Sequence, residues 1–274
     1  MLSHRPAPKT SPWLRTFLPR PGAAVRLVCF PHAGGAASSF RALAGLLPPE
    51  IELTAVQYPG RQDRYQAPFV TDMDELVAEI HQELAGRLDR PTAFLGHSMG
   101  ATVAYETARL LRPRFPSPLL ALFASARRAP DRCRPTGLDF TDDAVVRAFI
   151  RELGGAGADR LDDEDDLWQL TLPMLRNDFL LAEAYRHRPG PPLSCPIVAV
   201  SGDGDSRCTL DEARHWSGHT IGAFEAHALP GGHFYTEECP DRLAALLTGA
   251  LARYGAPVPA DPLPALPADV LVES

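Results

Sequence analysis

The pentapeptide Gly96-His97-Ser98-Met99-Gly100 constrains the fold of this chain more than any other feature. It joins a short apolar stretch at 92–95 directly to a helical pattern at 101–111. A G-x-S-x-G sequence in that context is typical of a sharp strand-to-helix turn that exposes a serine hydroxyl. We therefore predict that Ser98 is a nucleophile at the end of a strand. Taken alone, the five residues would also fit a glycine turn with an idle serine.

The rest of the chain alternates predicted strands with predicted helices. Further apolar runs that read as strands lie at 25–30, 51–58, 119–124, 197–201 and 224–229. Apolar residues with helical spacing occupy 73–88 and 243–251. This alternation predicts an α/β fold with a mostly parallel central sheet flanked by helices.

One long segment interrupts the alternation. Residues 130–192 contain no convincing strand but two helical patterns, at 142–153 and 165–186, and Pro173 should kink or split the second helix. We predict a helical lid inserted at about 130–190 in one domain that spans 21–254. The apolar face of the second helix fits either ordinary packing or the wall of a substrate pocket. Residues 1–20 and 255–274 are rich in proline and are predicted to be a flexible segment and a loose tail.

A serine hydroxyl needs a base within hydrogen-bond reach, and in this kind of fold the base comes last in the chain. His233 is the candidate, because it follows Gly231-Gly232 directly after the last predicted strand. An acid that orients the imidazole should follow the strand at 197–201, where Asp203 and Asp205 both stand. Asp205 is preferred because it lies farther out on the loop, whereas Asp203 would order the turn.

Two backbone amides should stabilise the oxyanion that forms when a serine attacks a carbonyl carbon. One should belong to the residue after the nucleophile, Met99, and the other to Ala33, in the loop Pro31-His32-Ala33-Gly34-Gly35 after an early strand. A plain glycine turn is the alternative interpretation of that loop.

Composition limits the classes of partner. The net charge of −7 argues against general binding of nucleic acid or of anionic membranes, and no apolar run is long enough to span a bilayer. The five cysteines are scattered, which favours a reducing, cytoplasmic location without a zinc site. The acidic run at 162–166 lacks the ligand spacing of a calcium loop and is interpreted as a solvated helix start. No metal or cofactor is expected, and nothing in the sequence requires more than a monomer.

Four stretches, taken in order, resemble one family. They are CFPHAGGAASSF (29–40), VQYPGRQDR (56–64), GHSMGATVAYETARLL (96–111) and LPGGHFY (229–235). Together they resemble the type II thioesterases that accompany polyketide and nonribosomal peptide synthases, which have the α/β-hydrolase fold. The resemblance implies a catalytic triad of Ser98, Asp205 and His233, and oxyanion amides at Ala33 and Met99.

The resemblance also implies the substrate, an acyl group in thioester linkage to the phosphopantetheine arm of an acyl or peptidyl carrier protein. Hydrolysis would clear stalled or wrongly loaded chains from the synthase. Because carrier proteins are usually acidic, we hypothesise a basic rim around the pocket mouth. Its candidates are Arg61, Arg64, Arg127, Arg128, Arg132 and Arg134; a merely solvated basic stretch is the alternative.

Two other functions remain open from the sequence. The same framework supports esterases, lipases and acyltransferases, because a fold alone does not choose a substrate. A catalytically silent protein that binds carrier proteins is the other alternative, and the presence of Ser98, Asp205 and His233 counts against it.

Overall fold

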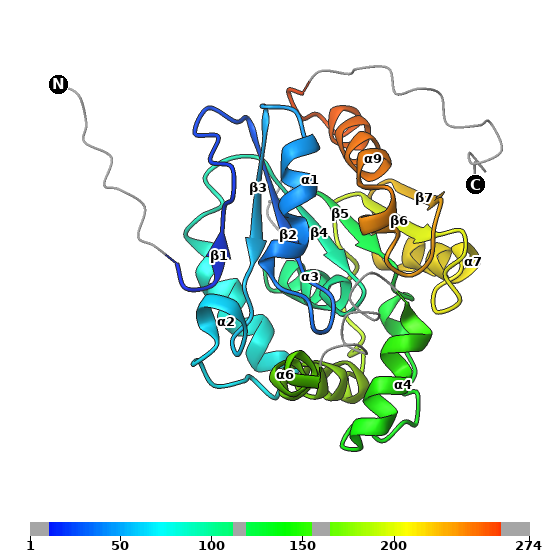
Figure 1. Cartoon of the computed structure of the whole chain (residues 1–274). Coiled ribbons are helices and arrows are strands. Elements are labelled where there is room, and N and C mark those ends of the chain that lie inside the picture. The colour runs from blue at the N-terminus through cyan, green and yellow to red at the C-terminus, as the bar shows by residue number, and fades with distance from the viewer. Residues whose placement is uncertain (1–10, 112–118, 155–164, 259–274) are drawn as a thin grey trace.

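A seven-stranded sheet forms the centre of the protein in the computed structural model, which describes residues 11–111, 119–154 and 165–258 (Figure 1). The strand order is β1-β3-β2-β4-β5-β6-β7, and all neighbouring strands are parallel except the pair β1 and β3. The strands are β1 (Leu14–Arg15), β2 (Val25–Phe30), β3 (Ile51–Val56), β4 (Thr92–His97), β5 (Leu119–Ser125), β6 (Ile197–Gly202) and β7 (Phe224–Leu229). The protein therefore has the predicted α/β-hydrolase fold with a mostly parallel sheet.

Helices connect the strands and cover both faces of the sheet. The longer ones are α1 (Arg41–Leu46), α2 (Met73–Ala85), α3 (Met99–Leu110), α4 (Asp143–Leu153), α6 (Asp165–Ala184) and α9 (Pro240–Arg253). Two single-turn helices, α7 (Leu210–Ala213) and α8 (Tyr235–Glu238), lie in the loops after β6 and β7. None of the helices in the described ranges is long and apolar enough to cross a membrane.

Each face of the sheet carries its own hydrophobic core, because successive side chains of a strand point to opposite sides. In β2, Leu27 and Cys29 belong to the core beneath α1 and α9, whereas Val28 and Phe30 belong to the core beneath α2 and α3. All four side chains are fully buried. This burial on both faces explains why the parallel strands read as continuous apolar runs.

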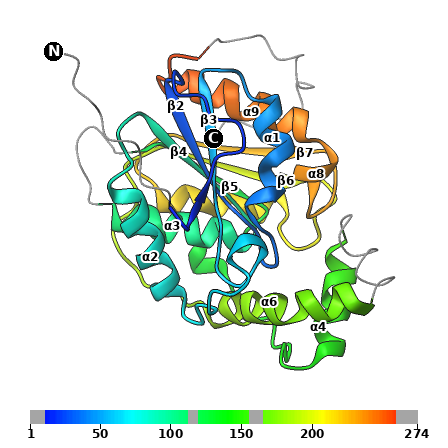
Figure 2. The same cartoon turned by 60° about the vertical axis from the view of Figure 1, so that its left-hand side comes forward.

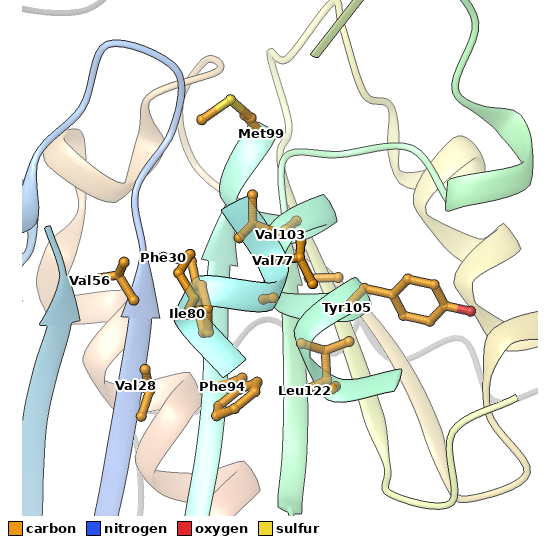
Figure 3. Close-up of a cluster of buried hydrophobic side chains, with 14 of the residues drawn as sticks. Val28, Phe30, Val56, Val77, Ile80, Phe94, Met99, Val103, Tyr105 and Leu122 are labelled. Carbon is orange, nitrogen blue, oxygen red and sulfur yellow. The ribbon is translucent and has the colours of Figure 1, made fainter. Parts of the chain in front are cut away.

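Figure 3 shows the core beneath α2 and α3 in close-up. Val77 and Ile80 of α2 and Val103 of α3 lie with Phe94 of β4 and Leu122 of β5 in one buried cluster. Because α3 is packed onto β4 and β5 through this cluster, the turn between β4 and α3 is held at a fixed place on the sheet edge.

The helices α4 and α6 follow β5 and lie side by side beyond one end of the sheet (Figures 1 and 2). They correspond to the two helices predicted within the inserted segment, and they share a small hydrophobic core of their own. Helix α6 runs through Pro173 without the split that the sequence allowed. Trp168 before the proline and Phe179 after it pack into that same core, which holds the two halves together.

The N-terminal segment differs from its prediction as a flexible segment. Trp13 is only 4% exposed, and the guanidinium of Arg64 lies 4.0 Å from the centre of its ring. Strand β1 pairs antiparallel with β3, which places Leu14 opposite Val56. The buried indole, the β1–β3 pairing and the hydrogen bonds from Arg20 to the carbonyls of Leu47, Pro48 and Ile51 together dock residues 11–20, an effect that proline content and weak periodicity do not reveal. Residues 1–10, and 259–274 of the predicted tail, lie outside the described ranges.

Truncation of this anchor should destabilise the protein. We expect Trp13→Ala to lower the free energy of unfolding by about 3–5 kcal/mol, because it removes a large side chain from a core that cannot fully collapse. Urea unfolding followed by circular dichroism measures the change. Leu18→Ala, at a side chain that is 45% exposed, is the control and should change stability by no more than about 0.5 kcal/mol. A loss below about 1 kcal/mol for Trp13→Ala would show that the segment is only loosely attached.

Candidate active site

Ser98 stands at the junction of β4 and α3 in a strained backbone conformation. Its φ is 53° and its ψ is −121°, a combination that residues with a side chain rarely adopt. The amide of Ser98 donates a 2.8 Å hydrogen bond to the carbonyl of Ser125 in the neighbouring strand β5. The sharp turn thus directs the hydroxyl away from the sheet edge and into the space beneath α4 and α6.

Gly100 allows the first turn of α3 to approach the end of β2. A Cβ at this position would lie 2.0 Å from the carbonyl oxygen of Phe30, which is closer than any side chain permits. The approach also brings the loop that follows Phe30 next to Ser98. The second glycine of the G-x-S-x-G sequence is therefore required by backbone proximity.

Three side chains predicted to act together are hydrogen-bonded in a row. The Oγ of Ser98 lies 3.0 Å from Nε2 of His233, although the two residues are 135 positions apart. On its other side, Nδ1 of His233 lies 2.9 Å from Oδ2 of Asp205. With the proton on Nδ1, the imidazole donates to the carboxylate and its Nε2 accepts from the serine hydroxyl. His233 and Asp205 are 7% and 4% exposed, so water competes little for these bonds.

Backbone amides hold the Asp205 carboxylate in place. Its Oδ1 accepts hydrogen bonds from the amides of Arg207 at 2.8 Å and Cys208 at 3.2 Å, which leaves Oδ2 for the imidazole. Asp203 has a different position, because its Oδ1 accepts from the amide of Gly231 at 3.0 Å. It thereby ties the β6 loop to the loop that carries His233. Of the two acids that the sequence offered, the structure brings Asp205 to the imidazole.

Ala33 and Met99, the predicted oxyanion residues, line the same cavity as Ser98 and His233. Met99 is the first residue of α3, where backbone amides have no partner within the helix and the helix dipole favours negative charge. Ala33 lies in a tight turn closed by a 2.9 Å hydrogen bond from the amide of Gly35 to the carbonyl of His32. The structure thus brings both predicted amides to the cavity that contains the serine.

The cavity has a volume of about 120 Å³. Its outer wall consists of three phenylalanines from the inserted segment, Phe140, Phe149 and Phe179, whose ring centres are 5.1 Å apart in each pair. The apolar face of α6 had two interpretations, ordinary packing and a pocket wall. Phe179 satisfies both, because its ring lines the cavity and also packs in the core that α4 and α6 share. Sequence reasoning did not single out Phe140 and Phe149, because a pocket wall and a core have the same apolar pattern.

The predicted arginine rim is correct only in part. Arg127, Arg128 and Arg134 line the cavity, and so does Arg207, which the sequence did not suggest. Arg61 is wrong as a rim residue, since it is 4% exposed and forms an ion pair inside the protein.

The two remaining rim candidates do not line the cavity either. Arg64 packs on Trp13 at the opposite edge of the sheet from β7, and Arg132 is exposed beside Asp131.

Two further histidines lie near the His233 imidazole. The ring of His97 lies 5.5 Å from that of His233 and 5.6 Å from that of His32. Burial lowers the pKa of His32 to about 4, with the nearby His233 as the next cause, and burial also holds the pKa of His97 well below its usual range. Both rings are therefore neutral near pH 7. Sequence reasoning missed this packing, because His32 and His97 have no spacing relation to His233.

No group of three or more His, Cys, Asp or Glu side chains in the described part of the chain is arranged to hold a metal ion. Ser98, His233 and Asp205 supply a hydroxyl, an imidazole and a carboxylate to the cavity, and Ala33 and Met99 line it beside them. Such a set can attack an activated carbonyl carbon and stabilise the resulting tetrahedral intermediate.

Comparison with known proteins agrees with this geometry. The family model described as thioesterase domain matches residues 25–251. The curated protein "Thioesterase PikA5" of Streptomyces venezuelae is 44% identical over 233 residues, which cover 82% of this chain and 80% of that protein.

Two solved structures are also similar. BorB, a type II thioesterase from the borrelidin biosynthetic cluster, is 40% identical with a TM-score of 0.79, and the match covers 87% of this chain and 97% of BorB. YbtT, a type II thioesterase from the yersiniabactin NRPS/PKS biosynthetic pathway, is 27% identical with a TM-score of 0.78, and the match covers 88% of this chain and 99% of YbtT. The chain thus belongs to the thioesterase family and is a hydrolase that acts on thioesters.

Proposed function

We propose that this thioesterase removes acyl groups from the phosphopantetheine arm of acyl or peptidyl carrier proteins, as an editing enzyme in polyketide or nonribosomal peptide biosynthesis. The hydrogen-bonded row of Ser98, His233 and Asp205 is the observation that carries the proposal. The names of BorB and YbtT, which are type II thioesterases of such pathways, support the choice of substrate.

In the first half of the proposed reaction, Ser98 Oγ attacks the thioester carbonyl carbon while His233 Nε2 takes the hydroxyl proton. The carbonyl oxygen becomes an oxyanion, which accepts hydrogen bonds from the amides of Ala33 and Met99. Asp205 stabilises the imidazolium that forms. When the tetrahedral intermediate collapses, the carbon–sulfur bond breaks, the imidazolium gives its proton to the departing thiolate, and the acyl group stays on Ser98.

In the second half, a water molecule takes the place of the thiol. His233 removes a proton from this water as its oxygen attacks the acyl-serine carbonyl carbon, and the same two amides accommodate the second oxyanion. Collapse returns the proton to Ser98 Oγ and releases the carboxylic acid. The aromatic wall of Phe140, Phe149 and Phe179 would shield the acyl chain from solvent during both steps.

The arginines at the cavity offer a docking site for an acidic carrier protein. Arg134 is exposed, and its guanidinium is held by the carbonyls of Asp131 and Cys133 at 2.8 and 3.2 Å. Arg128 is partly neutralised by Glu212, with 2.8 Å between the nitrogen and oxygen atoms. Arg134 is therefore the rim cation best placed to meet a carboxylate of the partner.

Removal of the serine hydroxyl tests the proposed mechanism. We expect Ser98→Ala to lower kcat by about 10⁴ to 10⁶, because the covalent route is lost, and Asp205→Asn to cost at most a similar factor. Steady-state hydrolysis of an acyl-pantetheine thioester measures both variants. Ser39→Ala, at an exposed serine, is the control and should match the wild type. A Ser98→Ala enzyme that kept a tenth of the wild-type rate would remove Ser98 from the mechanism.

The choice of leaving group separates the proposed activity from that of an esterase or acyltransferase. We expect kcat/KM for an acyl-pantetheine thioester to exceed that for the matching oxygen ester by at least about tenfold, because the thiolate leaves more readily. Both substrates carry the same acyl chain, and product acid is measured by titration. Equal values would favour a general esterase. Transfer of the acyl group to added alcohols in place of water would favour an acyltransferase.

Arg134→Gln tests carrier docking. We expect it to raise KM for an acyl-carrier protein about two- to fivefold and to leave KM for the acyl-pantetheine unchanged, because rim charges act mainly on protein association. Arg253→Gln is the control, since Arg253 ends α9 at the far end of the sheet from α4 and α6 (Figure 1). An equal effect of Arg134→Gln on both substrates would argue against docking at this rim.

A further inference from the structure

A buried ion pair joins the inserted helix α6 to the body of the protein. Arg61, in the loop after β3, forms two parallel hydrogen bonds to Asp178 of α6, from Nη1 to Oδ2 at 2.7 Å and from Nη2 to Oδ1 at 2.9 Å. Their side chains are 3% and 1% exposed. A bidentate pair of this kind fixes distance and orientation together, and breaking it would leave a charge without a partner inside the protein.

The same two side chains also hold the loop that contains Ala33. The amide of Gly34 donates a 2.8 Å hydrogen bond to Oδ2 of Asp178, and Nη1 of Arg61 donates at 2.8 Å to the carbonyl of Gly35. The first bond fixes the peptide plane between Ala33 and Gly34. Before this turn, the carbonyl of Pro31 accepts a 3.1 Å hydrogen bond from the hydroxyl of Tyr58. The Ala33 amide thus lies between backbone groups that are held on both sides.

Apolar contacts follow the same path. Gly34 has a φ of 77°, and a Cβ there would lie 2.3 Å from Cδ2 of Leu175, so α6 lies directly on the turn. Ala33 packs both against the core beneath α2 and α3 and against the core of the inserted helices. Leu175 and Asp178 are three residues apart and so share one face of α6. That face rests on the loop.

The Arg61–Asp178 pair also affects the charge next to the Ala33 turn. Without a counter-ion, the Asp178 carboxylate beside Gly34 would disfavour the negative charge that develops on the oxyanion at the Ala33 amide. Arg61 neutralises that charge, and Oδ2 of Asp178 accepts hydrogen bonds from both Nη1 of Arg61 and the amide of Gly34.

We propose that Arg61 and Asp178 are positioning residues for the reaction, which orient the Ala33 amide toward the oxyanion through Gly34 and Gly35. This inference rests on the proposed function, in which Ala33 supplies one of the two oxyanion hydrogen bonds. It assigns to α6 a direct part in stabilising the transition state, in addition to covering the acyl chain.

The principal test replaces both charges at once, in Arg61→Met/Asp178→Leu. An apolar pair of similar volume often keeps or improves stability where a single substitution would leave a buried charge. We expect kcat for acyl-pantetheine to fall by about 10- to 10³-fold, up to the loss seen when an oxyanion donor is removed, with KM within threefold of wild type. Circular dichroism and the melting temperature verify folding.

Two inhibitors separate positioning from simple structural support. An acyl trifluoromethyl ketone adds to Ser98 and forms an oxyanion, whereas the matching alkyl thioether fills the pocket without one. The double variant should lose affinity for the ketone by about the same factor as kcat and bind the thioether within threefold of wild type.

Two single variants complete the test. Asp178→Asn keeps an oxygen that can accept from Gly34 but leaves the buried Arg61 without a counter-ion, so its folding is verified by circular dichroism and by the melting temperature. The folded variant should lose less activity than the double variant, and an equal loss would contradict the role of this oxygen. Arg176→Gln is the matched control, because Arg176 pairs with Asp143 within the inserted helices and should leave kcat unchanged.

A folded double variant with wild-type kcat and ketone affinity would overturn the inference and leave the proposed function intact. A wild-type enzyme that neither hydrolyses the thioester nor forms the Ser98 adduct would overturn the proposed function itself, and this inference with it.

Discussion

The contact between Ser98 Oγ and His233 Nε2 is the constraint on which the rest of the site depends, because the two residues follow strands that are separated by two others. Ser98 follows β4 and His233 follows β7, with β5 and β6 between them. The distance of 3.0 Å is reached because both loops leave the same edge of a parallel sheet, and because Asp203 holds the β7 loop against the β6 loop. Sheet register and one loop hydrogen bond therefore set the geometry of the Ser98 hydroxyl and the His233 imidazole.

Much of the fold could be predicted from the sequence because its signals are local. Strands β2 and β7 have the predicted bounds, and the other predicted strands differ from the structure by at most two residues at one end. The elements that reasoning missed are short. Strand β1 has two residues, and α1 has six, which is too few for either period to show.

The candidate site divides in the same way. Ser98, Asp205 and His233 could be chosen because each stands directly after a predicted strand, and a parallel sheet brings such positions together. Arg61 was misplaced, since an arginine in a polar loop normally faces water and its partner lies 117 positions away. Asp178 was not selected at all, because a single acid within a helical pattern resembles any solvated position. An ion pair between residues that are far apart in the sequence cannot be recognised from the spacing of neighbouring residues.

In the proposed reaction the inserted segment supplies no reacting group, so its role depends on how its helices are held on the body. Phe140, Phe149 and Phe179 pack against one another in the core of the inserted segment. Helix α6 is also attached to the body, because Leu181 lies in the core beneath α2 and α3 and Nδ2 of Asn177 donates a 3.1 Å hydrogen bond to the carbonyl of Val70. The Arg61–Asp178 pair adds a charged attachment directly over the turn that contains Ala33. Movement of this part of α6 would therefore disturb the buried ion pair and the turn of Ala33 together, so the proposed role of the Ala33 amide requires this part of α6 to stay in place.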